Sequence, residues 1–139
     1  MGTALTHMTA YRWCGEKLLD HQGHIVAQGS RGALSIANQK IPVDVARPTP
    51  WTWQCNAKDL QATARTHAGM KSITVECAGR KYVMRRAGWR RRELVDSSGH
   101  CLAQINGLSI DAGSAIRTTD LVFAVYVARL IDAPFDVRI

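Results

Sequence analysis

One short basic segment, residues 80–92, carries the side chains best suited to chemistry in this chain. It contains no acidic residue and seven cations: Arg80, Lys81, Arg85, Arg86, Arg90, Arg91 and Arg92. Removing these seven from the 18 Lys and Arg residues leaves 11 basic against 11 acidic residues, so the segment holds the whole net charge of +7. Guanidinium groups form forked hydrogen bonds to phosphate oxygens. We therefore expect these residues to bind an anionic ligand.

The same charges have a second interpretation, in which they keep an exposed strand in water. Charge runs are commonly solvated faces, and cations also protect sheet edges from pairing with other chains. The positions 76 residues before the later cations are uncharged or acidic, so the repeat described below does not require cations there: Thr9, Ala10, Cys14, Gly15 and Glu16. The sequence leaves both interpretations open.

The remaining motifs give little support to catalysis. The sequence contains no nucleophile elbow, phosphate-binding loop, dinucleotide fingerprint or zinc-protease motif. His21 and His24 are spaced as H-x-x-H, but a metal site needs three or four converging ligands. His100 and Cys101 are strand neighbours whose side chains point to opposite faces, so they cannot form a catalytic pair. We expect no catalytic residue, no metal and no cofactor, hence a protein that is not an enzyme.

One pattern of residues occurs twice, offset by 76 residues: W-x4-L-[LV]-D-x2-G-H-x2-A-Q begins at Trp13 and again at Trp89. Self-similarity of this kind indicates a repeated structural unit. In each copy an Asp and a Gly bracket a four-residue turn, at 20–23 and 96–99. Each copy therefore predicts a β-hairpin, and we expect Trp13 and Trp89 to pack alike, in the core or at its rim.

Other segments also favour β structure, within a single domain from residue 10 to 139 that follows a tail at 1–9. Alternating apolar residues predict a hairpin over 71–86. Prolines at 42, 48 and 50 precede an expected strand that places Trp51, Trp53 and Cys55 on one face. Residues 57–68 are compatible with a helix or with short strands.

The C-terminal region differs from the rest because its apolar residues do not alternate. Thr118 or Thr119 can cap a helix over about 119–132, with Asp120 in its first turn. Residues 121–128 are apolar on every side of a helical wheel, a pattern typical of a buried helix. Eight residues are too few to span a membrane, although three valines also allow a strand. We expect a mainly β protein whose antiparallel barrel wraps around a buried C-terminal helix.

Three features together resemble the tubby-like superfamily, and especially its short bacterial LURP-one-like and phospholipid-scramblase-like members. They are the segment 80–85, the segment from Trp89 to Gln104 with its D-x-x-G turn, and the apolar helix after Asp120. The resemblance covers about residues 10–132. It implies an antiparallel barrel closed around a central C-terminal helix. It also implies non-enzymatic binding of phosphoinositides or other anionic lipid headgroups at a membrane surface.

The resemblance and the basic segment together favour an anionic lipid or another phosphate-bearing ligand as partner. Two alternatives remain: a scaffold domain that binds a protein, and a basic module that binds nucleic acid. Nucleic acid is less favoured, because only Tyr82 and Trp89 lie near the cations as stacking platforms. The four scattered cysteines and the absence of a secretory signal in residues 1–9 predict a cytoplasmic protein, peripheral at the membrane and without a spanning segment.

Overall fold

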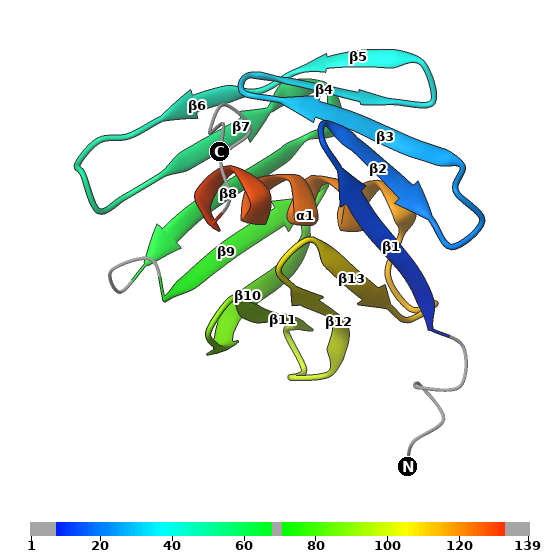
Figure 1. The fold of residues 1–139 in the computed structure, drawn as a ribbon. Helices are drawn as coiled ribbons and strands as arrows, with labels where there is room; N and C mark the ends of the chain where they lie inside the picture. Colours follow the sequence, from blue (N-terminus) through cyan, green and yellow to red (C-terminus); the bar gives the residue numbers. More distant parts are fainter. Residues whose placement is uncertain (1–7, 68–70, 133–139) are drawn as a thin grey trace.

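The computed structural model describes residues 8–67 and 71–132. Within them, 13 antiparallel strands form one sheet and a single α-helix, α1 (Thr118–Asp132), follows the last strand (Figure 1). A short 3-10 helix, η2 (Lys58–Leu60), precedes β8. The strands are β1 (Thr9–Cys14), β2 (Lys17–Asp20), β3 (Ile25–Ser30), β4 (Ala33–Ile36), β5 (Gln39–Pro42), β6 (Asp44–Ala46), β7 (Gln54–Ala57), β8 (Ala62–His67), β9 (Ser72–Cys77), β10 (Arg80–Gly88), β11 (Arg91–Asp96), β12 (Cys101–Asn106) and β13 (Ser109–Ala112).

The sheet curls into a nearly closed barrel because its two outermost strands are consecutive in the chain. The order is β5-β4-β3-β2-β1-β13-β12-β11-β10-β9-β8-β7-β6, so β5 and β6 are the edges. Val43 alone separates these strands, and its amide donates a hydrogen bond of 3.0 Å to the carbonyl of Gly32. One extended segment, 39–46, therefore pairs with β4 at its start and with β7 at its end.

The apolar helix predicted near the C-terminus lies inside this barrel, as Figure 1 shows. Every residue from Asp120 to Ala128 is buried, and so is Leu130. The phenol of Tyr126 donates to the carbonyl of Ser30 at 2.6 Å and accepts from the amide of Gly32 at 3.2 Å. These bonds satisfy the one polar group that the middle of the helix carries into the core. The mainly β architecture with a buried C-terminal helix is confirmed.

Small inward-facing residues make room for the helix on one side of the barrel. Strand β8 alternates buried and exposed residues along its whole length, with Ala62 and Ala64 directed inward. Ala57 of β7 is fully buried beside them. The sequence left the segment 57–68 open between helix and strand: residue 57 ends β7, 58–60 form η2 and 62–67 form β8, while residue 68 lies outside the described residues. Period-two burial decides the matter, since a helix would have grouped these alanines differently.

The two predicted turns with Asp and Gly at their ends have the same hydrogen bonds. Oδ1 of Asp20 accepts the amides of Gln22 and His24, each at 2.9 Å. Oδ1 of Asp96 accepts the amides of Ser98 and His100 at the same distances. The flanking strands also share one register, since Leu18 pairs with Ala27 and Leu94 with Ala103, and a bulge follows each pair.

The equivalence does not extend to the tryptophans, and the expectation that Trp89 packs like Trp13 is wrong. Trp13 pairs with Leu18 and is 2% exposed, whereas the residue that pairs with Leu94 is Met84, itself fully buried. Trp89 is 81% exposed, beyond the last pair of the β10–β11 ladder. The reason is that the β10–β11 hairpin is longer than the β1–β2 hairpin. Its strands continue to pair past Met84, so Trp89 lies outside the core.

The predicted strand face containing Trp51 is also wrong in part. Strand β7 begins at Gln54, and only Cys55 of the three predicted residues lies in it. Trp53 is 7% exposed, but Trp51 is 68% exposed in the loop before the strand. A turn closed by Thr49 and Thr52 holds this loop: the amide of Thr52 donates to the carbonyl of Thr49 at 3.2 Å. Because the chain turns there, alternation cannot begin until after Trp51.

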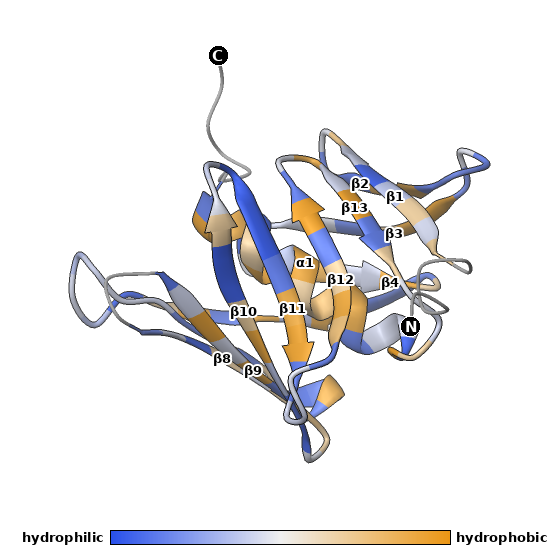
Figure 2. Ribbon diagram, turned by 90° about the horizontal axis from the view of Figure 1, so that it is seen from below, coloured by the Kyte–Doolittle hydropathy of each residue, from blue (hydrophilic) through white to orange (hydrophobic). Residues whose placement is uncertain are grey.

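The first seven residues of the predicted tail, and residues 133–139 of the predicted domain, lie outside the described part of the chain. Strand β1 begins at Thr9, so the barrel starts one residue earlier than the predicted domain. In the views of Figures 1 and 2, β1 lies next to β13 and joins the first hairpins to the last ones.

Candidate anion-binding surface

The seven predicted cations are distributed between the two ends of the barrel. We call these the Asp120 end, where α1 begins, and the Asp132 end, where it finishes. Strand β10 starts with Arg80 at the Asp120 end and runs to the tip of the β10–β11 hairpin at the Asp132 end. Figure 2 shows that the more hydrophilic half of this hairpin lies towards its connecting turn. The cations of one strand therefore belong to two separate ends of the barrel.

Arg80 binds the first turn of the helix and belongs to the fold. Its Nε donates to Oδ2 of Asp120 at 2.7 Å and its second guanidinium nitrogen donates to Oδ1 at 3.0 Å. The hydroxyl of Tyr82 donates to the same carboxylate at 2.5 Å. Burial raises the pKa of Asp120, but the bonds from Arg80 and Tyr82 outweigh it and hold that pKa below its usual range. Burial and the bond to Asp120 raise the pKa of Tyr82 to about 12.

Arg92 binds the other end of the helix in the same manner. Its side chain is only 1% exposed, and it is among the largest fully buried side chains of the described residues. It donates to both oxygens of Asp132, from Nε at 2.5 Å and from a terminal nitrogen at 3.0 Å. Arg86 adds a contact of 3.3 Å to Oδ1 of Asp132. A guanidinium buried with its counterion is held in place and is not available to a ligand from solution.

Two further cations lie on the outside of the barrel. Arg85 is exposed and donates from Nε to Oε1 of Glu93 across the β10–β11 ladder at 3.0 Å. Such exposed pairs contribute little to stability and exchange readily with other partners. Lys81 is exposed near the Asp120 end, and within residues 8–67 and 71–132 it has no carboxylate within ion-pair distance.

The remaining two cations and one tryptophan form the tip of the β10–β11 hairpin, which we call the Trp89 tip (residues 89–91). The guanidinium of Arg90 lies 4.6 Å from the centre of the Trp89 ring. Arg90 has a φ of 59°, a left-handed conformation that costs a non-glycine residue free energy. Arg91 is exposed, and neither arginine pairs with a carboxylate in the described part of the chain.

The structure therefore does not bring all seven cations to one point. It pairs the partly exposed Arg80 with the buried Asp120 and the buried Arg92 with the partly exposed Asp132, and it places Arg86 beside Asp132 and Arg85 opposite Glu93. It leaves the Trp89 tip and Lys81 accessible, at different ends of β10. Anion binding by the segment stays a prediction, and the Trp89 tip is the part of it that is best able to meet a ligand.

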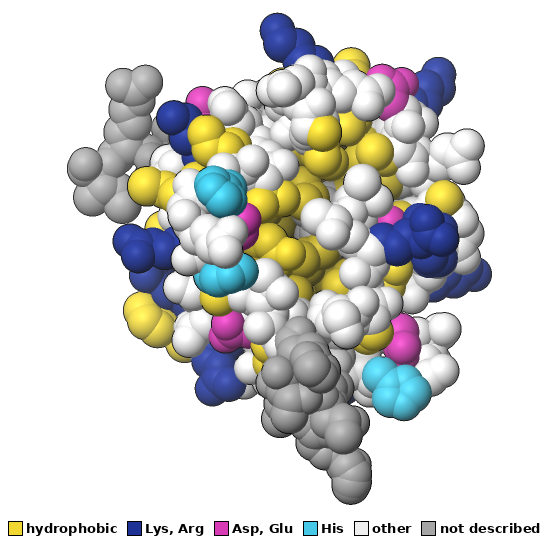
Figure 3. Space-filling model, turned by 90° about the vertical axis from the view of Figure 1, so that its right-hand side faces the viewer, with side chains coloured by type: hydrophobic (Ala, Val, Ile, Leu, Met, Phe, Trp, Pro, Cys, Tyr) yellow, Lys and Arg dark blue, Asp and Glu magenta, His cyan; other side chains and the backbone are white. Residues whose placement is uncertain are grey.

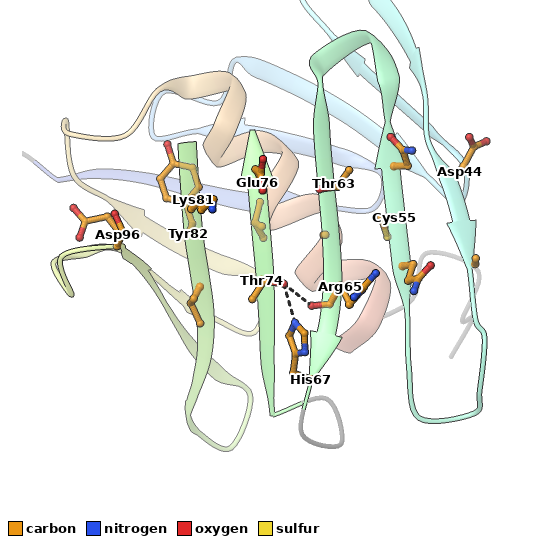
Figure 4. A pocket seen from close by; sticks show the side chains of 17 residues that line it. Asp44, Cys55, Thr63, Arg65, His67, Thr74, Glu76, Lys81, Tyr82 and Asp96 are labelled. Atoms are coloured by element: carbon orange, nitrogen blue, oxygen red, sulfur yellow. Dashed lines mark hydrogen bonds between the residues drawn. The ribbon is translucent and has the colours of Figure 1, made fainter. Parts of the chain in front are cut away.

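A hollow among the described residues lies elsewhere, across strands β6 to β10 (Figure 4). It has a volume of about 780 Å³, and acidic and basic side chains alternate around it: Asp44, Arg65, Glu76, Lys81 and Asp96. On its wall Nε2 of His67 lies 2.9 Å from the hydroxyl oxygen of Thr74. Mixed charge of this kind does not select an anion. Lys81 is the one predicted cation that lines the hollow.

The groups that could act as nucleophiles or metal ligands are not assembled into a site. Within residues 8–67 and 71–132, no three His, Cys, Asp or Glu side chains are grouped closely enough to hold a metal ion. Burial raises the pKa of the Cys55 thiol to about 11 and that of Cys77 to about 12, so both remain protonated at neutral pH. Figure 3 views the Asp120 end, where apolar side chains fill the centre and charged and histidine side chains lie around the rim.

Two features were missed from the sequence. Asp120 and Asp132, the acidic partners of Arg80 and Arg92, flank the apolar helix, and that flanking position could have suggested a pairing with the excess arginines. Trp51 was assigned to a strand face because it alternates with Trp53, and only the Thr49–Thr52 turn shows that it is exposed. No local signal in the sequence distinguishes the exposed Trp51 from the buried Trp53.

None of the helices in the part of the chain described here has the length and apolar character needed to cross a bilayer. Comparisons of the chain with family models, with curated proteins and with solved structures found no match.

Proposed function

We propose that this protein is a non-enzymatic binding module of the tubby-like type, and that it binds anionic lipid headgroups at a membrane surface through the Trp89 tip. The observation that carries the proposal is the state of Trp89: an indole 81% exposed, with the guanidinium of Arg90 at 4.6 Å and Arg91 beside it. An indole with an apolar body and a polar N–H is best accommodated at a membrane–water interface.

The charges of the tip support the same partner. A Lys or Arg near an anionic bilayer contributes about 1 kcal/mol to binding. The left-handed φ of Arg90 means that a cation occupies a position where glycine would be more stable. Phosphate oxygens of a headgroup match the forked donors of Arg90 and Arg91.

The fold supports the tubby-like assignment. A barrel closed around a C-terminal helix agrees with the architecture that the resemblance implies. The two hairpins with equal register and equal turn hydrogen bonds are what duplication of an ancestral unit would leave, although the tryptophans have diverged. We propose that the offset of 76 residues records such a duplication. We also propose that the protein acts in the cytoplasm, at the membrane face.

The experiment is sedimentation of the full chain with vesicles of phosphatidylcholine alone, or with added phosphatidylserine or a phosphoinositide. The test variant is Arg90→Asn with Arg91→Gln, in which Asn tolerates the left-handed backbone. The matched control is Lys40→Ser with Lys58→Ser, which removes the same charge from the opposite end of the barrel.

We expect binding to anionic vesicles only, weakened by added salt, roughly 25-fold lower in the Arg90/Arg91 variant and much less reduced in the control. Equal loss in both variants would mean that net charge, and not the tip, determines binding. Failure of the unaltered protein to sediment with any anionic vesicle would exclude the proposal.

One observation favours a second candidate, a scaffold that binds a protein. The hollow of about 780 Å³ across β6–β10 presents both signs of charge, as surfaces that recognise protein partners do. A protein partner captured equally by the unaltered chain and by the Arg90/Arg91 variant, but lost on Arg65→Glu, would favour this candidate. Binding to duplex or single-stranded nucleic acid at low salt is the third outcome to be measured, with the same variants.

A further inference from the structure

Exposed apolar side chains are concentrated at one end of the barrel. Each strand runs antiparallel to the next, except that β5 and β6 continue in one direction as the extended segment 39–46, so the connecting turns alternate between the two ends. The turns at 15–16, 31–32, 47–53, 89–90 and 107–108 therefore share the Asp132 end, and Figure 1 shows several of them on the left. Among the described residues, four large hydrophobic side chains are exposed, and three of them lie in these turns: Trp51, Trp89 and Leu108.

The loop that carries Trp51 is held in a defined shape. The amide of Thr49 donates to Oγ1 of Thr52 at 3.0 Å, and the two hydroxyl oxygens lie 2.9 Å apart. The guanidinium of Arg47 donates to the carbonyl of Pro50 at 2.6 Å and lies 4.5 Å from the centre of the Trp53 ring. These contacts fix the loop around a buried Trp53 while Trp51 remains 68% exposed. Exposure of Trp51 is thus a property of the folded loop.

Basic side chains are concentrated at the same end. At the Asp132 end, the turns and the strand and helix ends carry two acids, Glu16 and Asp132, of which Asp132 is paired with Arg86 and Arg92, and six further cations: Lys17, Arg31, Arg47, Lys71, Arg90 and Arg91. The Asp120 end has acids and bases in comparable numbers: Asp20, Asp59, Asp96 and Asp120 beside Lys58, Arg80, Lys81 and Arg117. The charge of the molecule is therefore polarised along α1.

We propose that the protein docks end-on, with its Asp132 end against an anionic lipid bilayer, and that Trp51 is a second membrane anchor beside Trp89. The inference rests on the proposed function and adds the orientation and a contact that the basic segment 80–92 does not contain. The β6–β7 and β10–β11 hairpins are four strand spacings apart, roughly 19 Å along the curved sheet. Two indoles this far apart fit an extended surface such as a bilayer and exceed the size of a single headgroup.

A bilayer is favoured over the other anionic partner, nucleic acid, by the geometry of the rings. The guanidinium of Arg90 already covers Trp89 at 4.6 Å, so one ring face is occupied and unavailable to a stacked base. Leu108, 43% exposed in the neighbouring turn, has no role in base recognition but adds apolar area to an interfacial contact. Exposed apolar residues with surrounding cations are the composition of surfaces that lie in the headgroup layer.

The test uses fluorescence quenching in phosphatidylserine vesicles that contain brominated phosphatidylcholine. Trp13 and Trp53 are buried, at 2% and 7% exposure, so quenching on binding reports Trp51 and Trp89. The variants are Trp89→Phe, Trp51→Phe and the double substitution. Affinity is measured separately for Trp51→Ala, with Ile25→Ala as the matched control because Ile25 is exposed at the opposite end.

We expect Trp89→Phe to retain about half of the quenching and the double variant to lose nearly all of it, with Trp51→Ala roughly tenfold weaker in vesicle affinity and Ile25→Ala unchanged. If the Trp89→Phe variant binds vesicles without quenching, Trp51 does not enter the bilayer: end-on docking is then refuted while the proposed function survives. If the unaltered protein binds no anionic vesicle, both fail. Loss of nucleic-acid affinity in Trp51→Ala, without loss of vesicle affinity, would replace the bilayer by nucleic acid.

Discussion

The buried pair of Arg92 and Asp132 gives the most stringent test of which arginines the fold requires. Asp132→Ala leaves a guanidinium that is 1% exposed without its counterion. Removal of one partner from a buried pair costs 3–5 kcal/mol, and we expect about 3 kcal/mol because Asp132 itself is 27% exposed. At a typical urea dependence of about 2 kcal/mol per molar, the unfolding midpoint falls by about 1.5 M.

The reciprocal change should cost less. Arg92→Met keeps most of the buried volume, and the carboxylate of Asp132 stays 27% exposed to solvent and keeps its contact with Arg86 at 3.3 Å. The loss is that of hydrogen bonds to a charged group, about 1.5 kcal/mol. The double variant then removes the unpaired guanidinium and should be more stable than Asp132→Ala alone, by about 1 kcal/mol or more.

The assay is equilibrium urea unfolding followed by tryptophan fluorescence and by circular dichroism, since coincident curves justify a two-state treatment. Arg91→Met is the control because it removes a cation from the exposed neighbouring position, and it should change the midpoint little. The reasoning is that burial of the guanidinium sets the loss of stability. It would be refuted if Arg92→Met lowered the unfolding free energy as much as Asp132→Ala does and the double variant recovered none of it.

Three further predictions concern the core, pH and the Trp89 tip. Val125→Asp forces an unpaired charge into a site that is 1% exposed, so we expect no cooperative thermal transition by circular dichroism and mostly insoluble protein. The pKa of Asp120 is lowered in the folded state, so its contribution to stability is full above about pH 4 and is lost as the pH falls further. The urea midpoints at pH 7 and pH 3 should therefore differ less in the Asp120→Asn variant than in the unaltered protein. Arg90→Gly should raise the unfolding free energy by about 1 kcal/mol by relieving the φ of 59°, and lower vesicle affinity roughly fivefold; unchanged stability would mean that the tip is unstrained.

The architecture was largely accessible from the sequence because its signals are local and periodic. An apolar run without alternation predicted the buried helix, and the two D-x-x-G turns fixed the hairpins around them. The hairpin over 71–86 matches β9 and β10. The error on Trp89 has a different origin: hairpin length depends on where pairing stops, and pairing runs on from Met84 to Gly88, directly before Trp89.

The sequence could not show which cations of the basic segment are paired and which are exposed. That division depends on contacts with a helix about 40 residues away in the chain. Strand alternation distinguishes Arg91 from Arg92 in principle, since neighbours face opposite sides of a sheet. It does not reveal that the inward side at that level holds a carboxylate. An arginine that faces the inside of a barrel normally argues against the strand assignment that puts it there. Here Asp132 supplies the counterion, so Arg92 can be a core residue.

Some cations of the basic segment are paired with α1 and the others are exposed, and this explains how a strongly cationic strand pair can lie against an apolar core. Arg80 and Arg92 are neutralised by the two ends of α1, so the helix supplies a counter-charge at each end of the barrel. The cations in excess of these pairs lie outside: the extended β10–β11 hairpin places Arg91 in its last ladder pair and Arg90 beyond that pair, next to the exposed indole of Trp89. The charge of +7 is therefore a poor measure of the charge that the surface presents, because Arg80 and Arg92 contribute to it while each is paired with an aspartate of α1.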